Sequence, residues 1–457
     1  MTDQGHGRTW KTRMASFLAP VPHMRRSIQF IAAALALLTL MSPVSARRRD
    51  QAWRSHSVKF ANRDFERQVN LADPVGNTFS TIQDSKYSVL LIDNQHFWNL
   101  GDEVSLHIDV PYLIAFAQGN VNVGGNLQHF EDTVTGLRDI VITPTYWLVD
   151  PDAPQGGHNI SLQLRLKTGT KRLSTNEQQV LTFIREGGLS VLNSFGQFAS
   201  SVQTLFSGGT EFTLSNNWSW RLSDRQSFDF AAGYNYSGRY SPNENFPTIV
   251  NPYDWTHFRG VYSTSPHRRL RHSVGLDTSF FTSGTIENPR NDNAQEQTPA
   301  ARSSLDLRNS FVKGKRPDLQ REAAWNLFYS RSSVHSHRSA SSWTTSYVHS
   351  GEQDVITSDG GVIRRVRPGD YASIGYNFTQ KASSGFLLNY GFDLGHIAKS
   401  RAPQVDLGDD TQRFLATTKL GAKRSTHSGH SYGADFQIGL NKDTPRLVAN
   451  ASYTFAW

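Results

Sequence analysis

The sequence predicts an all-β protein, a transmembrane antiparallel up-and-down β-barrel of about sixteen strands, within about 12–18. Three observations favour this class. Segments of about ten residues alternate between apolar and polar positions along most of the chain. An apparent export leader precedes them, and no cysteine is present. An exported chain without disulfides needs a large core or a closed hydrogen-bonded sheet.

The first 46 residues have the order expected of a secretory signal peptide. Arg25 and Arg26 precede an apolar run over 28–40, and Val44-Ser45-Ala46 follows as a small-x-small cleavage site. The run is shorter than the ~20 residues that span a bilayer. We therefore expect cleavage after Ala46 and export to the bacterial outer membrane. Translation could begin at Met1, Met14 or Met24.

Composition narrows the class further. Hydrophobic residues make up only 37% of the chain although aromatic residues reach 11%, as expected if half of each strand faces polar surroundings. After the leader, no apolar stretch is long enough for a membrane helix. The mature chain would hold 42 basic and 38 acidic residues, a net charge of +4. So small an excess gives no support for nucleic acid as a partner.

The barrel is predicted over residues 86–457 as one domain. In the segment near residue 165, Ile160, Leu162 and Leu164 alternate with polar and basic positions. Breaks at 222–226 and 441–446 are short and are predicted as periplasmic turns. Breaks at 237–253, 283–301, 351–369 and 399–411 are long and polar and are predicted as external loops.

Two stretches lack this pattern. Residues 47–85 are polar with scattered phenylalanines, and we expect a periplasmic segment or a plug. Residues 177–207 have apolar positions nearer a helical period. They are predicted as a short helical loop outside the barrel, or alternatively as a constriction within the lumen.

The final eleven residues alternate, with Tyr453, Phe455 and Trp457 on one face. An ordinary last core strand would show the same period. In an exported barrel, we expect this aromatic face to be the signal by which the barrel-assembly machinery, a partner, recognises the chain.

The lumen is predicted from the polar faces of the strands, where charged residues and glycines recur. The candidate lumen-lining residues are Arg165, Lys167, Arg308, Lys419, Asp393 and Asp435. A basic lining would attract carboxylates or phenolates. The compact basic runs at 267–272 and 364–367 have a simpler explanation, contact with lipopolysaccharide, which we expect as a partner together with outer-membrane lipids.

Catalytic and metal-binding patterns are weak. Gly429-His430-Ser431-Tyr432-Gly433 fits the hydrolase motif G-x-S-x-G, but a strand follows where that motif needs a helix. His335 and His337 could face one side of a strand, but Arg331 and Arg338 flank them and disfavour a cation. We therefore expect no catalytic residue, no metal ligand and no cofactor.

A family resemblance is carried by the segments 102–112 and 136–146. The first ends in Val110-Pro111-Tyr112, and the second begins Gly136-Leu137-Arg138-Asp139. The chain resembles outer-membrane transporters linked to the phenol-degradation meta pathway, in which a strand ending in Val-Pro-Tyr precedes a Gly-Leu-Gly-Asp turn. Arg138 replaces the second glycine. The match covers about a quarter of the chain and implies a barrel that passes aromatic or other hydrophobic molecules.

Together these features predict a channel for passive uptake of small, hydrophobic or aromatic compounds, not an enzyme. Two other classes stay open. A barrel enzyme acting on lipid would need a reactive Ser431 or histidine cluster, and a structural or adhesive barrel would have a filled lumen.

Overall fold

The computed structural model describes the wall of a β-barrel and parts of its connections. It describes residues 52–72, 78–101, 103–123, 126–150, 153–166, 209–241, 247–289, 314, 316–356, 362–382, 385–401, 412–426 and 429–456. The chain divides into two units, 1–44 and 45–457, and every described residue belongs to the second. The leader and the stretch 177–207 lie outside the described residues.

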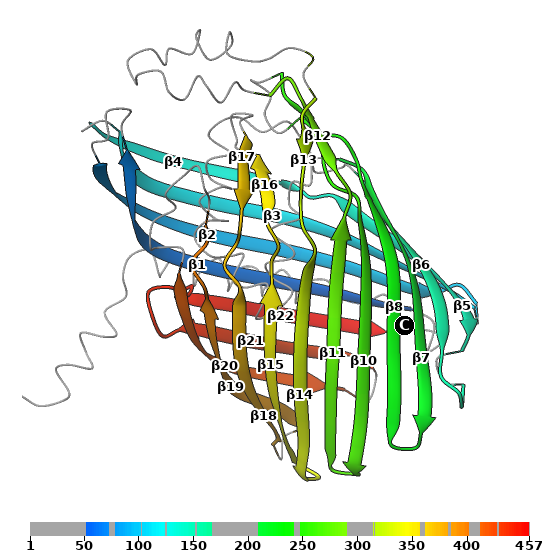
Figure 1. Cartoon of the computed structure of the whole chain (residues 1–457). Helices are drawn as coiled ribbons and strands as arrows, with labels where there is room; N and C mark the ends of the chain where they lie inside the picture. The colour runs from blue at the N-terminus through cyan, green and yellow to red at the C-terminus, as the bar shows by residue number, and fades with distance from the viewer. Residues whose placement is uncertain are drawn as a thin grey trace, which may run out of the picture. The chain divides into compact units, whose positions relative to one another are not determined.

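The wall is a closed antiparallel sheet whose strands follow one another around the ring (Figure 1). In chain order its strands are β1 (Ala52–Ala72), β2 (Thr78–Asn99), β3 (Val104–Val123), β4 (Asn126–Leu137), β5 (Ile140–Val149), β6 (His158–Leu166), β7 (Glu211–Ser223), β8 (Gln226–Ser237), β10 (Trp255–His267), β11 (Leu270–Phe281), β14 (Ala324–Ser336), β15 (Ser339–His349), β18 (Tyr371–Lys381), β19 (Phe386–Ile397), β20 (Arg413–Ser425), β21 (Ser431–Gly439) and β22 (Leu447–Ala456).

The first strand closes the ring against the last. Residues 53–62 of β1 pair with residues 447–456 of β22, and Arg446 N donates to Asn62 O at 3.0 Å. The strands β4 and β5 pair with successive parts of the same edge of β3, so they share one position in the ring. The barrel therefore has 16 positions, which confirms the predicted fold class and strand number.

The predicted plug or periplasmic segment at 47–85 is wrong, because the barrel begins at Ala52. β1 pairs with β2 over its full length, from Ala52 opposite Trp98 to Ala72 opposite Thr78. Its alternation was hidden because small and charged residues occupy many of its positions. Sheet pairing, not hydrophobic period, fixes this segment as strand.

The two ends of the barrel differ. Short connections join β7 to β8, β10 to β11, β14 to β15, β18 to β19 and β20 to β21 at one end, here called the turn end. The long connections leave from the opposite loop end. The short break 441–446 joins β21 to β22 and therefore lies at the loop end, contrary to the prediction that short breaks are confined to the periplasmic side.

Three of the predicted loops contain secondary structure. A small sheet forms from β9 (Ile249–Asn251), β12 (Gly284–Glu287) and β13 (Asp318–Leu319), and β16 (Gln353–Ile356) pairs with β17 (Val362–Val366). Val250, Ile286, Leu319 and Val362 are buried together, with Tyr240 and Tyr253 packed on them. These loop segments thus have an apolar core of their own.

The outward face is apolar and exposed. Leu276, Leu327 and Leu420 are 45%, 48% and 53% exposed, and many of their outward neighbours are tyrosine, phenylalanine or tryptophan. So large an apolar surface on a closed barrel is typical of contact with lipid. Within the described residues, the structure has no helix of the length and apolarity needed to cross a membrane.

Outward tyrosines at the loop end donate hydrogen bonds to carboxylates that directly precede the next strand. Tyr234 Oη donates to Asp254 Oδ2 at 2.7 Å, and Tyr347 Oη donates to Asp370 Oδ2 at 2.8 Å. Burial alone would raise the pKa of Asp370, but hydrogen bonds from Tyr347 and His349 outweigh it and hold that pKa below its ordinary value. These pairs fix aromatic rings where the apolar belt ends.

The inward face is not uniform. Toward the loop end of β1 to β3 it is apolar, and Ala61, Val89, Leu91, Leu113 and Ala115 are all buried to 1% exposure or less. Toward the turn end the same face carries an ion pair, in which Lys59 Nζ lies 3.2 Å from Asp93 Oδ2. On β6 to β11 it is polar. The apolar residues of β2 and β3 therefore occupy both faces, which a period-two pattern does not anticipate.

Candidate functional site

One functional candidate is a cavity of about 750 Å³ against the inner wall near the loop end, called here the loop-end cavity. Inward positions of β6, β7, β8, β10 and β11 form its wall, because cross-strand pairing brings them to one height. Its lining residues are Gln163, Arg165, Glu211, Thr213, Ser215, Asn235, Ser237, Pro252, Tyr253, Trp255, His257, Ser279, Phe281 and Arg321.

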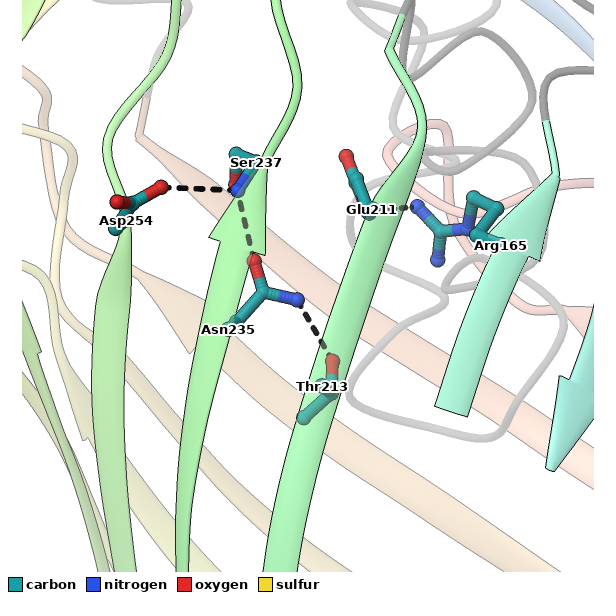
Figure 2. Close-up of polar contacts among 6 residues, drawn as sticks. All are labelled: Arg165, Glu211, Thr213, Asn235, Ser237 and Asp254. Carbon is teal, nitrogen blue, oxygen red and sulfur yellow. Dashed lines mark hydrogen bonds and ion pairs between the residues drawn. The ribbon is translucent and has the colours of Figure 1, made fainter. Parts of the chain in front are cut away.

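An ion pair lies on one side of this cavity (Figure 2). The register of β6 and β7 puts Arg165 opposite Glu211, and Arg165 Nη1 donates to Glu211 Oε2 at 2.6 Å. Each side chain is only 17% exposed. Partial burial and a short charge-assisted hydrogen bond make this pair a fixed element of the wall.

Neutral polar groups continue from the ion pair along β7 and β8. Asn235 Nδ2 donates to Thr213 Oγ1 at 2.7 Å, and Ser237 Oγ donates to Asn235 Oδ1 at 2.9 Å. Ser237 N in turn donates to Asp254 Oδ1 at 2.9 Å, as Figure 2 shows. Asn235 and Ser237 are both buried. Their mutual hydrogen bonds hold these side chains in one arrangement.

The opposite side of the cavity is aromatic. The rings of Tyr253 and Phe281 meet edge to face, with centroids 6.3 Å apart, and the Trp255 ring lies 5.2 Å from that of His257. The guanidinium of Arg321 lies over the Phe281 ring, 4.0 Å from its centroid. Tyr253 Oη lies 3.0 Å from Gln320 O and 3.1 Å from Asp354 O, which anchors the aromatic side to the loop segments.

A second cavity, of about 320 Å³, continues along the same wall toward the turn end. Its polar lining includes Asn217, which donates to Asn159 Oδ1 at 2.9 Å, and Ser219, which donates to Asp229 Oδ1 at 2.6 Å. Arg259 lines it and contacts Asp277 at 3.5 Å. Because β7, β8 and β10 contribute to both cavities, hydrogen-bonding groups extend along the lumen from one end toward the other.

The predicted lumen residues fall in different places. Arg165 lines the loop-end cavity. Lys419 forms an ion pair with Asp393 on inward positions of β20 and β19, so their charges cancel locally. Asp435 is paired across the sheet with Gly421 and Asn450. Lys167 and Arg308 lie outside the described residues.

Several glycines lie opposite larger inward side chains, which occupy the volume that a side chain at the glycine would fill. A Cβ at Gly375 would lie 2.5 Å from Asp393 Oδ1, and one at Gly421 would lie 2.0 Å from Asp435 Oδ1. The His257 ring similarly covers Gly233, at 2.1 Å from a built Cβ. The recurrence of glycine and charge on one face thus has a steric cause.

Of the terminal aromatic face, Tyr453 and Phe455 lie on outward positions of β22. The His430 ring stacks on both, with centroids 6.1 and 6.3 Å away, and Tyr453 Oη lies 3.2 Å from His430 Nδ1. Trp457 and Ala46 lie outside the described residues.

The remaining sequence motifs have structural surroundings. Ser431 begins β21, where it is opposite Ser425 and Thr454, and a strand follows it. His335 Nε2 lies 2.8 Å from Ser341 Oγ, and its ring stacks on Phe378. In the described part of the chain, no three histidine, cysteine or acidic residues gather as metal ligands would.

The two basic runs lie at opposite ends of the barrel. Arg268 and Arg269 form the turn between β10 and β11, at the turn end, whereas Arg367 lies at the loop end, where its backbone pairs with Arg401. Lipopolysaccharide on a single membrane face could therefore contact only one run.

Arg321, Glu211 and the aromatic residues of the cavity are the groups that sequence reasoning missed. Arg321 falls between β13 and β14, in a stretch without a period, so only its contact with Phe281 identifies it. Glu211 starts β7 after a connection of more than forty residues from β6. For Glu211, alternation along β7 can indicate the face of the strand but not that Arg165 is its partner.

Among known proteins, only solved structures are similar to this chain. No protein-family model matches the chain, and no curated protein matches it. Three similar structures are an outer-membrane channel of Pseudomonas putida F1 (8% identity, 91% of this chain and 100% of that chain, TM-score 0.33), OccK5 of Pseudomonas aeruginosa (7%, 90% and 99%, TM-score 0.35) and the toluene transporter TodX of P. putida (9%, 90% and 91%, TM-score 0.37). With TM-scores this low, the strand pairing of this chain itself defines its architecture.

Proposed function

We propose that the protein is an outer-membrane channel for passive passage of small molecules with a hydrophobic or aromatic body. The observation that carries this proposal is the loop-end cavity inside a closed barrel. It combines three aromatic rings with hydrogen-bonding groups and lies within a wall whose outer surface is apolar. Because lipid would surround the apolar outer surface, a polar solute would not cross beside the barrel and would have to pass through the lumen.

The polar wall supports passage rather than tight capture. Ligand sites that retain their ligand enclose it, whereas a channel needs binding weak enough to allow release. Here hydrogen-bonding side chains continue from the loop-end cavity to the second cavity along β7 and β8. A solute could exchange partners step by step along them.

Proteoliposome swelling tests this function. Purified protein reconstituted into liposomes should admit arabinose and small aromatic alcohols faster than protein-free liposomes do. A large sugar such as raffinose should enter more slowly than arabinose. Correct insertion is checked by the shift in gel migration on boiling, and equal swelling rates with and without inserted protein would contradict a channel.

A further inference from the structure

We propose that Arg321 and Phe281, together with Tyr253 and Trp255, form a binding site for small aromatic carboxylates in the loop-end cavity. This inference rests on the proposed channel function and deepens it, because it names one class of solute and the side chains that would select it.

The charge of the cavity favours an anion. Apart from His257, the ionisable side chains of its described lining with an acidic or strongly basic group are Arg165, Glu211 and Arg321. Arg165 and Glu211 neutralise one another at 2.6 Å. Within the described chain, Arg321 forms no ion pair with a carboxylate, so its positive charge is the excess charge of the described lining. A partly enclosed cavity concentrates the field of such a charge.

The geometry of Arg321 suits a carboxylate. Its guanidinium carbon lies over the Phe281 ring, 4.0 Å from the centroid, and a guanidinium carries five N–H donors in its own plane. A guanidinium presents two parallel N–H donors to a carboxylate, a match that lysine cannot provide. The side chain is exposed toward the cavity that it lines.

The backbone around Arg321 is held in place before any ligand binds. Arg321 forms a bridge with Gln353, Asp354 N donates to Gln320 O at 2.9 Å, and Glu322 N donates to Glu352 O at 2.8 Å. Hydrogen bonds on both sides of the residue fix its Cα position. A preorganised group loses less entropy when a ligand binds.

The aromatic rings supply a place for the body of the ligand. Phe281 and Tyr253 meet edge to face, and Trp255 lines the same cavity one inward position from His257. A planar ring attached to the carboxylate could contact these rings while the carboxylate meets Arg321. An aliphatic acid of the same charge would gain less from such contacts.

Equilibrium dialysis of detergent-solubilised protein against radiolabelled benzoate tests the site. We expect benzoate to bind at least about tenfold more tightly than the neutral isostere benzamide. Only benzoate accepts a charge-assisted hydrogen bond from Arg321, and such a bond contributes enough free energy for a factor of this size. Acetate should compete poorly. The variant R321Q should lose about tenfold in benzoate affinity, while R321K should lose less because the charge remains.

The matched control is R338Q, which removes the same charge from the exposed turn between β14 and β15, at the turn end. It should bind benzoate like the unaltered protein. Equal affinity for benzoate and benzamide, or unchanged benzoate affinity in R321Q, would overturn the site. If R321Q fails to insert, F281L replaces it, and unchanged benzoate affinity in F281L would equally overturn the proposal.

The outcome separates this site from the channel itself. Absence of benzoate binding together with swelling by arabinose would refute the site and leave the channel standing. Binding without swelling would refute the channel and support the site.

Discussion

At the scale of single residues, the cations that were predicted to line the lumen and are described in the structure form ion pairs with neighbouring carboxylates. Arg165 was predicted as part of a basic lining that attracts anions. It is instead joined to Glu211, with both side chains 17% exposed. Lys419 is joined to Asp393 in the same way. When the cation of such a pair is removed, the charge of its carboxylate partner is no longer neutralised. The change in ion selectivity therefore depends on the carboxylate that remains.

Substitutions of the Arg165–Glu211 pair should shift ion selectivity in opposite directions. Arg165→Ala leaves a carboxylate in the cavity, so the reversal potential in a tenfold KCl gradient should move toward cation preference. Glu211→Gln leaves the guanidinium and should move it toward anion preference. The double variant should lie near the unaltered protein. Shifts of the same sign in both single variants would contradict this arrangement.

The sequence predicts which face of a strand a residue occupies better than it predicts which residue it contacts. Alternation indicated that Arg165, Asp393 and Lys419 share the polar face, because a strand has a period of two. It could not indicate that Lys419 meets Asp393, because register between strands is set by the folded sheet. Arg321 had no period around it, and nothing in its segment indicated a contact with Phe281.

At the scale of elements, the outer face of each strand depends on lipid contact. Leu276 lies in the middle of β11, is 45% exposed and is opposite Leu327 of β14. Leu276→Arg should destabilise the inserted barrel by about 2–4 kcal/mol, the cost of a cation near the centre of the bilayer. Urea unfolding of protein refolded into lipid vesicles measures this change.

The matched control for that substitution lies on the inward face of β14. Ser330→Arg adds the same side chain at an inward position of the next strand, where polar groups surround it, and should cost much less. Equal costs at Leu276 and Ser330 would show that the two faces do not differ in their surroundings.

The last strand allows a test of assembly. Phe455 is opposite Arg54, and Ala456 is opposite Trp53, in the ladder that closes the ring. Deleting 455–457 removes these pairs and the terminal rings, so we expect an exported chain that is degraded in the periplasm. Immunoblots of outer-membrane fractions measure the yield. Trp457→Phe should keep it, and a normal yield of the truncated chain would refute the assembly signal.

Elements with a strong period were predictable, and those with a mixed composition were not. The alternation near residue 390 identified β19. Over 388–395 its outward residues are large, and its inward residues are glycine, asparagine or aspartate. β1 was not predicted as a strand because charged residues interrupt its alternation of apolar and polar positions. β9, β12 and β13 are two to four residues long, so their pairing depends on the shared core of Val250, Ile286 and Leu319 rather than on local pattern.

At the scale of the whole molecule, closure of the ring is what converts sixteen strands into a membrane-spanning wall. An open sheet would leave unpaired backbone groups in lipid. The pairing of β1 with β22 removes both edges, although the two strands lie at opposite ends of the chain. No local pattern predicts this contact, since it joins residues about 400 positions apart.

The inner wall differs from one side to the other in a way that composition does not indicate. On β1 to β3 an apolar part of the inner wall and the Lys59–Asp93 ion pair beside it are largely buried, whereas the polar wall on β6 to β11 faces the two cavities. A solute path should therefore follow the polar wall. This asymmetry is consistent with a lumen narrower than sixteen strands alone would leave.

Recordings from planar lipid bilayers test the central claim, an open path through the barrel, most directly. Purified protein added at low concentration in 1 M KCl, where the Debye length is only about 3 Å, should produce uniform stepwise increases in current. Insertion is verified separately by the gel shift on boiling. Inserted, folded protein that gives no current steps would contradict the account.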